Sequence, residues 1–247
     1  MSGLVDSIRE NYQRALDQIA GAAHRSNRDP EDVRLVVVTK SQPLEVVRSA
    51  IEAGVKILGE NYPEEGVTKI QSMPAQSGVE WHMIGHVQSR KARLVADHFE
   101  LLHSLDGLKL ARRLDRFAAE RGRVLSVLLE FNVGGEESKS GWEASDVSAW
   151  DAFLPDVSAV LDLPNLHVQG LMTMPPLGTV PEDSRRFFRS LRLLRDHLAS
   201  LYPKADWRDL SMGTSADYTV AVEEGATLVR VGTAIVGERK YNPEKEA

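Results

Sequence analysis

The sequence predicts an α/β fold, a single (β/α)8 TIM barrel with an extra N-terminal helix. About eight short apolar runs recur along the 247 residues, and each is followed by a segment with helical spacing. Regular alternation over about 250 residues suits an eight-stranded barrel better than an open sheet of five or six strands. No linker rich in proline, glycine or serine interrupts the alternation, so we expect one domain, residues 1–247.

An additional helix is expected ahead of the first strand. Leu4, Ile8, Tyr12, Leu16 and Ile19 recur at helical spacing and share one face. Because this helix precedes the first strand, we expect it to cover the bottom or the side of the barrel.

The predicted strands are apolar runs, which are typical of strands buried on both faces. The first, RLVVV, begins at Arg34 and leads into Lys40. The remaining strands are expected, in order, within VKILGENY, VEWHMIGH, ELLHSLD, VLSVLLEFNVG, LHVQGLMTMPP, RDLSMG and TLVRVGTAIVG.

The predicted helices carry apolar residues three or four positions apart, with proline at the start or glycine at the end. In LKLARRLDRFAAERG, for example, Leu110, Leu114 and Phe117 share one face. The other helices are expected within PLEVVRSAIEAG, Pro63–Gln71, SRKARLVADH, the segment from Trp142 to Leu161, SRRFFRSLRLLRDHLASLY and SADYTVAVEEG.

Composition excludes several classes of function. Hydrophobic residues make up 42% and charged residues 27%, as in a soluble protein with a full core. Acidic residues outnumber basic ones, 36 to 30, so we expect neither nucleic acid nor membrane as a partner. Cysteine is absent, which excludes disulfides and thiolate chemistry. With a charged N-terminal segment and no long apolar stretch, we expect a cytoplasmic protein, and a monomer.

Two basic residues stand at the ends of the first and last predicted strands, where such barrels carry their chemistry. Strand parity places Lys40 on the same side as Val36 and Val38, and Arg230 on the same side as Leu228. If these sides face inward, burial lowers the pKa of the lysine and makes its amine nucleophilic. The arginine keeps its charge and requires an acceptor.

A candidate anion site follows the last two strands. SMGTSAD is expected to open a helix, where backbone N–H groups and the helix dipole attract phosphate. Phosphate binding at this place is common in the fold. An amine and a phosphate cradle together suit a phosphorylated aldehyde, and pyridoxal 5′-phosphate, held as a lysine Schiff base, is the commonest. The motif puts Ser211, Gly213, Thr214 and Ser215 at the opening of this helix, and Gly232 and Thr233 stand in the corresponding place after the last strand.

Each of these features has a simpler explanation. A lysine at a strand end can be a surface residue with a buried stem. Serine and glycine at a helix start are ordinary caps. Arg230 can be a structural cation paired with a core carboxylate such as Glu130. His82 and His86 have metal-binding spacing only on a helix, and their segment is predicted to be a strand, so no metal is expected.

The sequence is similar to the pyridoxal phosphate homeostasis proteins, which resemble the N-terminal barrel of alanine racemase. The motifs are VVVTKSQP, LGENYPEE, WHMIGHVQSRKA, LHSLD, FNVGGEESKSG, GLMTMPP and LSMGTSADYTVAVEEGATLVRVGTAIVGER. The resemblance implies that Lys40 forms the internal aldimine and that Arg230 faces the pyridine nitrogen. It further implies phosphate contacts from Ser211, Gly213, Gly232 and Thr233, and a cavity lined by Asn61 and Asn132. Thr214 and Val236 depart from the family pattern at the pocket edge.

The resemblance also implies a binding protein that stores, buffers or delivers the cofactor, with apo-enzymes as recipients. An arginine at the pyridine nitrogen makes the ring a poor electron sink. The chain ends fourteen residues after Thr233, whereas alanine racemase uses a second domain to bring a base to the opposite face. We therefore assign no catalytic residue. The alternative is a pyridoxal-phosphate-dependent amino-acid racemase or decarboxylase of low activity, and a more distant one is a Schiff-base aldolase.

Overall fold

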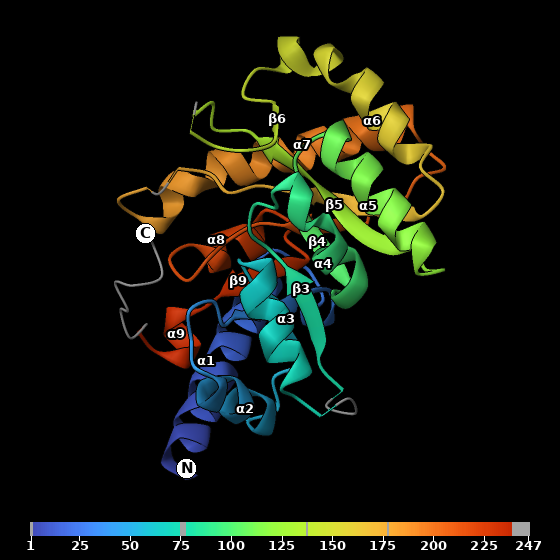
Figure 1. Ribbon diagram of the computed structural model, residues 1–247. Helices are drawn as coiled ribbons and strands as arrows, with labels where there is room; N and C mark the ends of the chain where they lie inside the picture. The colour runs from blue at the N-terminus through green and yellow to red at the C-terminus, as the bar shows by residue number, and fades with distance from the viewer. Residues whose placement is uncertain (1, 75–77, 137, 177, 239–247) are drawn as a thin grey trace.

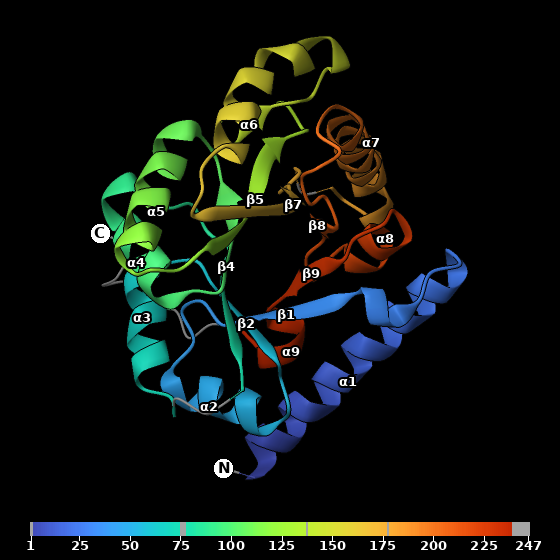
Figure 2. The ribbon, with the colours of Figure 1, turned by 90° about the vertical axis from the view of Figure 1, so that its right-hand side faces the viewer.

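Eight parallel strands close into a barrel in the computed structural model, which describes residues 2–74, 78–136, 138–176 and 178–238. Strand β1 pairs with β2 and β9, and the β4–β5 pairing completes the ring (Figure 2). The predicted (β/α)8 barrel is confirmed. Its strands are β1 Arg34–Val38, β2 Ile57–Glu60, β3 Glu80–Met83, β4 Leu101–Leu105, β5 Leu125–Asn132, β7 Leu166–Met172, β8 Asp209–Ser211 and β9 Leu228–Val231.

Alternating side chains of each strand separate an inner from an outer apolar layer. Val36 and Leu228 belong to a small cluster inside the barrel, with Val38 packed against it. Leu35 and Val37 point the other way, into the larger core between strands and helices. Because Val36 lies in register with Arg230, the barrel confirms the strand parity that brings the ends of β1 and β9 together.

Helices surround the barrel on its outer side (Figures 1 and 2). They are α2 Leu44–Glu52, α3 Pro63–Gln71, α4 Ala92–His98, α5 Leu108–Glu120, α6 Leu154–Leu161, α7 Arg185–Leu201, α8 Tyr218–Glu223 and α9 Thr233–Val236. Short 3-10 helices lie at η1 Pro30–Asp32, η2 Ser89–Lys91, η3 Val147–Ala152 and η4 Pro181–Ser184. Across the described ranges, no helix combines the length and the apolar character that crossing a bilayer requires.

The segment from Trp142 to Leu161 is mostly helical, as predicted, with η3 Val147–Ala152 and α6 Leu154–Leu161, but its start differs. Its first two residues form the short strand β6, Trp142–Glu143, which pairs with the end of β5 outside the barrel. The Trp142 ring lies 5.6 Å from the ring of Phe131. This pairing depends on a contact between separate elements, so local spacing did not reveal it. The α-helix α6 begins only at Leu154.

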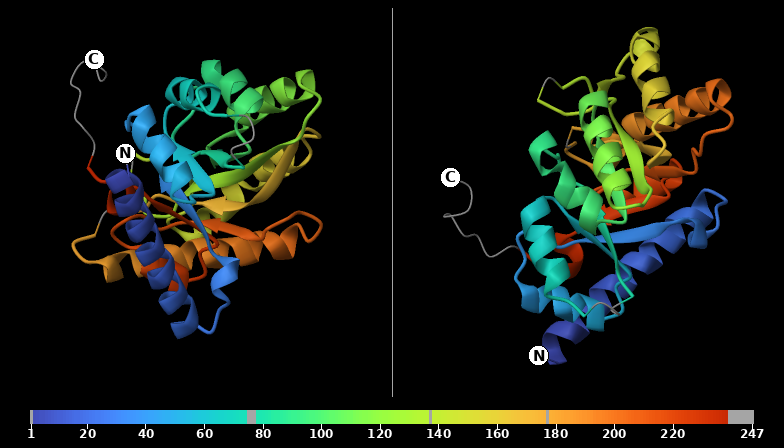
Figure 3. Two further views of the ribbon diagram at one scale, coloured as in Figure 1. Left: turned by 90° about the horizontal axis from the view of Figure 1, so that it is seen from below. Right: turned by 45° about the vertical axis from the view of Figure 1, so that its right-hand side comes forward.

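The first helix, α1 Ser2–Arg25, covers the side of the barrel. It packs against α2, α8 and α9, and Figure 3 shows its blue ribbon beside the red ribbon of the last elements. Asn11 Nδ2 donates to Ile235 O at 3.2 Å, and Arg25 forms an ion pair with Glu223 at 2.7 Å. Helix α1 therefore supports the two helices that follow β8 and β9.

Candidate functional site

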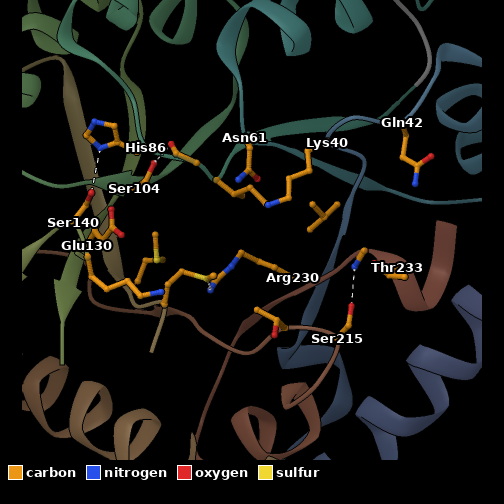
Figure 4. Close-up of a pocket in the computed structure, with 18 of the residues that line it drawn as sticks. Lys40, Gln42, Asn61, His86, Ser104, Glu130, Ser140, Ser215, Arg230 and Thr233 are labelled. Carbon is orange, nitrogen blue, oxygen red and sulfur yellow. Dashed lines mark hydrogen bonds between the residues drawn. The ribbon is translucent and has the colours of Figure 1, made fainter. Parts of the chain in front are cut away.

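A cavity of about 360 Å³ opens at the carboxyl ends of the barrel strands (Figure 4). Its size lies in the usual range of small-molecule sites. Five of the predicted site residues line it, from the segments that follow β1, β2 and β9 and from β9 itself. They are Lys40, Asn61, Arg230, Gly232 and Thr233.

Lys40 follows β1 directly, and both of its neighbours are held in place. The Thr39 hydroxyl donates to Glu60 Oε1 at 2.6 Å. The backbone N–H of Ser41 donates to Glu65 Oε1 at 2.8 Å. Ser41 has a φ of 58°, in the left-handed region that a serine rarely adopts. The backbone that presents Lys40 is therefore fixed by side chains from β2 and α3.

A buried ionic cluster supports this turn. Lys69 Nζ lies 2.8 Å from Glu60 and 2.7 Å from Glu65, and it donates to Thr39 O at 2.6 Å. Burial raises the pKa of Glu60, and the charge of Lys69 opposes that shift. The sequence analysis missed this cluster. Glu65 and Lys69 are four residues apart in the helix that follows Glu60, and this spacing could have indicated the cluster.

Asn61 lines the cavity where the segments after β2 and β3 approach closely. A Cβ atom at Gly85 would lie 2.4 Å from Asn61 O, so only glycine fits between them. Ser104 Oγ donates to Gly85 O at 2.6 Å and holds this contact from β4. Three neighbouring strands thus form one wall of the cavity.

Arg230 carries a buried positive charge into the cavity. The residue is only 4% exposed. Its Nη1 donates to Ser211 Oγ, and its Nη2 donates to Thr173 O at 2.9 Å and to Met174 Sδ at 3.0 Å. Burial lowers the pKa of Arg230 to about 10, so it stays protonated at neutral pH.

The direct ion pair of Arg230 with Glu130 is not formed. Within the described residues, no carboxylate lies within 4 Å of the guanidinium, and Glu130 and Asp217 raise its pKa only through longer-range attraction. A buried cation whose contacts are neutral is poorly compensated by the protein. Arg230 is therefore arranged to face a ligand acceptor.

The opposite end of the cavity carries hydrogen-bond donors. Thr214, Ser215, Gly232 and Thr233 line it, and Gly232 N donates to Ser215 Oγ at 3.2 Å (Figure 4). The hydrogen bonds of the described residues leave the backbone N–H groups of Ser215 and Thr233 without a protein acceptor. Free donors at the wall of a cavity suit an anion such as phosphate.

Ser211 does not line the cavity. It is completely buried, and its hydroxyl lies between Arg230 and His103 Nδ1, at 2.7 Å from the latter. The expected helix start at Ser211–Ser215 is also absent, because α8 begins at Tyr218 and Asp217 Oδ1 takes the N–H of Thr214 at 2.7 Å. Ser215, which belongs to the expected anion site but not to the phosphate ligands implied by the resemblance, lines the cavity instead.

Gly213 and Asn132 also lie outside the cavity wall. Gly213 has a φ of 89° and packs against α8, where an added Cβ would lie 2.5 Å from Ala221 Cβ. Asn132 closes the loop after β5, since its Oδ1 accepts from Gly135 N at 3.0 Å and its Nδ2 donates to Glu136 O at 2.9 Å. Both residues shape loops beside the cavity, and neither is among the residues that line it.

The wall farthest from Lys40 carries groups that the candidate list omitted. Glu130 is 8% exposed, and its Oε2 has no hydrogen-bond partner among the described residues. Burial, followed by repulsion from Asp106, raises the pKa of Glu130 to about 7. His86 Nδ1 lies 2.8 Å from Asp106 and 3.3 Å from Ser140 Oγ (Figure 4). Strand parity with Leu128, inside the barrel, could have indicated that Glu130 points inward.

The cavity fits the cofactor expected from the sequence. An amine, a buried cation and a set of free donors occupy one cavity, and these match the aldehyde, pyridine nitrogen and phosphate of pyridoxal 5′-phosphate. The two histidines of WHMIGH are directed to different places, since His82 contacts His103 inside the barrel and His86 contacts Asp106 at the cavity.

Comparisons with known proteins agree with this geometry. Residues 5–240 match the family described as alanine racemase, N-terminal domain. The pyridoxal phosphate homeostasis protein of Aquifex aeolicus is 41% identical over 232 residues, which cover 94% of this chain and 98% of the relative. The structure of PipY from Synechococcus elongatus with PLP bound is 34% identical, with a TM-score of 0.75, and covers 90% of this chain and 99% of that chain. An alanine racemase from Clostridium difficile shares the fold, with a TM-score of 0.71 at 14% identity, over 96% of this chain and 58% of that chain.

Proposed function

Because this chain belongs to the family of pyridoxal phosphate homeostasis proteins, we propose that it binds pyridoxal 5′-phosphate in the strand-end cavity and stores, buffers or delivers it in intracellular vitamin B6 homeostasis. One observation carries the proposal. Lys40, the buried cation of Arg230 and the donors around Ser215 and Thr233 line the same cavity.

Each part of the cavity has a role toward this cofactor. Lys40 bonds to the aldehyde carbon, Arg230 faces the pyridine nitrogen, and Ser215, Gly232 and Thr233 hold the phosphate. Asn61 lines the wall beside Lys40. When bound, the cofactor supplies an electrophilic aldehyde and a ring that can accept electrons. The anchored turn at Lys40 means that the backbone carrying the amine is already fixed before the cofactor arrives.

The proposed role is binding rather than catalysis. A cation at the pyridine nitrogen disfavours protonation of the ring, and an unprotonated ring is a weak electron sink. Among the described residues Arg230 contacts only neutral groups, so its charge acts on whatever lies in the cavity. Arg230 therefore supports retention of the cofactor while suppressing side reactions.

Replacement of Lys40 tests the function. Purified wild-type protein should show the visible absorption of the lysine-bound cofactor, and borohydride should fix the cofactor to Lys40. Lys40→Ala should lose both signals and keep its thermal unfolding transition, because one strand-end side chain contributes little to the core. Lys139→Ala, which removes a second cavity lysine, is the matched control and should keep both signals. A reducible adduct in Lys40→Ala would overturn the assignment.

Glu130 favours a second candidate, an amino-acid racemase or decarboxylase of low activity. A carboxyl group with a pKa of about 7 in a cavity can exchange protons at neutral pH. Turnover of added amino acids by the loaded protein, lost in Glu130→Gln, would support this candidate. Turnover at rates typical of enzymes, on the order of 1 per second or faster, would contradict the binding function and favour the racemase or decarboxylase.

Three further expectations stay predictions. Apo-enzymes should receive the cofactor, which a transfer assay with free aldehyde trapped would detect. The protein should be a monomer in size-exclusion chromatography with light scattering. Cell fractionation should find it in the cytoplasm.

A further inference from the structure

A row of polar side chains crosses the inside of the barrel from one mouth to the other. Ser211 Oγ lies 2.7 Å from His103 Nδ1, His103 Nε2 lies 3.0 Å from His82 Nδ1, and His82 Nε2 lies 3.4 Å from Glu80 Oε2. Arg230 Nη1 contacts the Ser211 hydroxyl at the cavity end. Glu80, the first residue of β3, stands at the opposite mouth with its side chain 58% exposed. We call these five residues the axial relay.

The donors and acceptors of the axial relay can be arranged in only one way while its histidines are neutral. A guanidinium has no acceptor, so Ser211 Oγ accepts from Arg230. At the other end the Glu80 carboxylate only accepts, so His82 must donate to it from Nε2 and accept at Nδ1. His103 must then donate from Nε2 to His82 Nδ1, and the Ser211 hydroxyl proton points to His103 Nδ1. Every hydrogen bond thus points from Arg230 toward Glu80.

Burial keeps both imidazoles neutral. His82 and His103 are 1% and 0% exposed. Burial lowers the pKa of His82, and it lowers the pKa of His103 well below the usual value, with added repulsion from His82 and Arg230. Arg34 and Asp209 form an ion pair at 2.6 Å in the same lower part of the barrel. Arg34 lowers the pKa of His82 and Asp209 raises it, so their effects oppose each other.

We propose that the axial relay is a positioning device for Arg230, so that cofactor affinity depends on side chains that never touch the cofactor. Aligned dipoles turn their negative ends to the guanidinium and connect it to a carboxylate at the far mouth. They stabilise the buried charge without placing a carboxylate in contact with the guanidinium, where it would attract a proton to the pyridine nitrogen. The link to affinity rests on the proposed function, whereas the arrangement of protons does not.

The arrangement of protons can be tested without cofactor. Long-range ¹H–¹⁵N spectra of protein with ¹⁵N-labelled histidine distinguish the two neutral tautomers and the cation. Seven histidines contribute signals, and His82→Gln and His103→Gln assign the two that matter. Both rings should be neutral, with the proton on Nε2 and an accepting Nδ1. A cationic ring, or a proton on His103 Nδ1, would overturn the axial relay.

The effect on binding is tested by removing one hydroxyl. Ser211→Ala should weaken pyridoxal 5′-phosphate binding about 10- to 100-fold, because Arg230 loses a hydrogen bond that holds its charge. Ser126→Ala is the matched control, since Ser126 hydrogen-bonds to Gln169 at 3.0 Å within the barrel strands but outside the relay, and it should bind within about twofold of wild type. Equal affinities of the two variants would overturn the proposal.

The exposed end provides a second pair of variants if Ser211→Ala does not fold. Glu80→Gln should shift the His82 Nε2 signal and weaken binding, whereas Glu100→Gln should do neither. Glu100 Oε2 accepts from Trp81 N at 2.7 Å at the same mouth, so both variants remove one negative charge there. Matching effects would show a general charge effect and contradict the relay. A wild type with the expected tautomers but no cofactor binding would refute the proposed function and leave the proton arrangement standing.

Discussion

Two cations are buried within one barrel, and their surroundings differ. Lys69 is 3% exposed and lies between the carboxylates of Glu60 and Glu65. Arg230 is 4% exposed and donates to a hydroxyl, a carbonyl and a thioether. Lys69 and Arg230 are buried to a similar extent. Among the described residues, however, only Lys69 is in contact with carboxylates.

The difference separates a structural charge from a functional one. Removal of one partner of a buried ion pair strongly destabilises the folded protein, because the remaining charge is buried without a counterion. Lys69 is committed in this way to the turn that presents Lys40. Arg230 has no such partner in the described part of the chain, so its charge and its remaining N–H groups are available to a ligand.

Removal of the matched cation should have the largest effect on stability. Lys69→Met leaves Glu60 buried without a counterion and should lower the free energy of unfolding by about 3–5 kcal/mol. Urea denaturation followed by circular dichroism measures the change. The double variant Lys69→Met with Glu60→Gln should recover part of the loss. A loss below about 1 kcal/mol would mean that the ion pairs of Lys69 contribute little to stability, which would contradict the comparison with Arg230.

Glu130 extends the comparison to a buried carboxylate without a cation in contact, and its effect should depend on pH. Its pKa in the folded protein is about 7, against an ordinary value of 4.5. Between these values the folded state holds the proton that the unfolded chain releases, so the free energy of unfolding falls as pH rises through this window. The loss should reach at most about 3 kcal/mol above pH 7.

Glu130→Gln removes this titration and tests it. The variant should match wild type near pH 4.5 and be more stable at pH 8, with the gap opening between these values. Thermal unfolding at a series of pH values checks the direction. If wild type and variant differ in stability by the same amount at every pH, Glu130 does not titrate in this window and the prediction is wrong.

Removal of the unmatched cation should have the smallest effect on stability and a clear effect on binding. Arg230→Met removes a cation that no carboxylate of the described residues contacts, so the free energy of unfolding should change by only about 1 kcal/mol. Affinity for pyridoxal 5′-phosphate should fall, which fluorescence titration measures. A loss of several kcal/mol in stability with unchanged affinity would reverse the roles that the comparison gives to Lys69 and Arg230.

The sequence predicted most of the barrel because its local patterns agree with its tertiary structure. The valines of β1 and the spaced leucines of α5 have the same periodicity in the chain and in the fold. The prediction of a mostly helical segment after Trp142 holds from Val147 onward but not at Trp142–Glu143, which pair with the end of β5. Strand β6 depends on residues from another element, which no local window contains.

The candidate site was predictable only in part for a similar reason. Strand parity was sufficient for Lys40 and Arg230, because a closed barrel fixes which side chains point inward. Parity could not show that the Ser211 hydroxyl is occupied by Arg230 and His103, or that Ser215 reaches the cavity in its place. These outcomes depend on competition for hydrogen bonds between strands that are distant in sequence.

The packing of α1 against α8 and α9 has a consequence for the order of folding. Helix α1 leaves the ribosome before the strands of the barrel, whereas α8 and α9 follow β8 and β9. The contacts that close the barrel between β1 and β9 have the same large sequence separation. Contacts between residues that are far apart in the sequence form slowly. The growing chain therefore exposes the part of α1 that packs on α8 and α9 until those two helices are synthesised, and the cofactor site is assembled only after β9 joins the barrel.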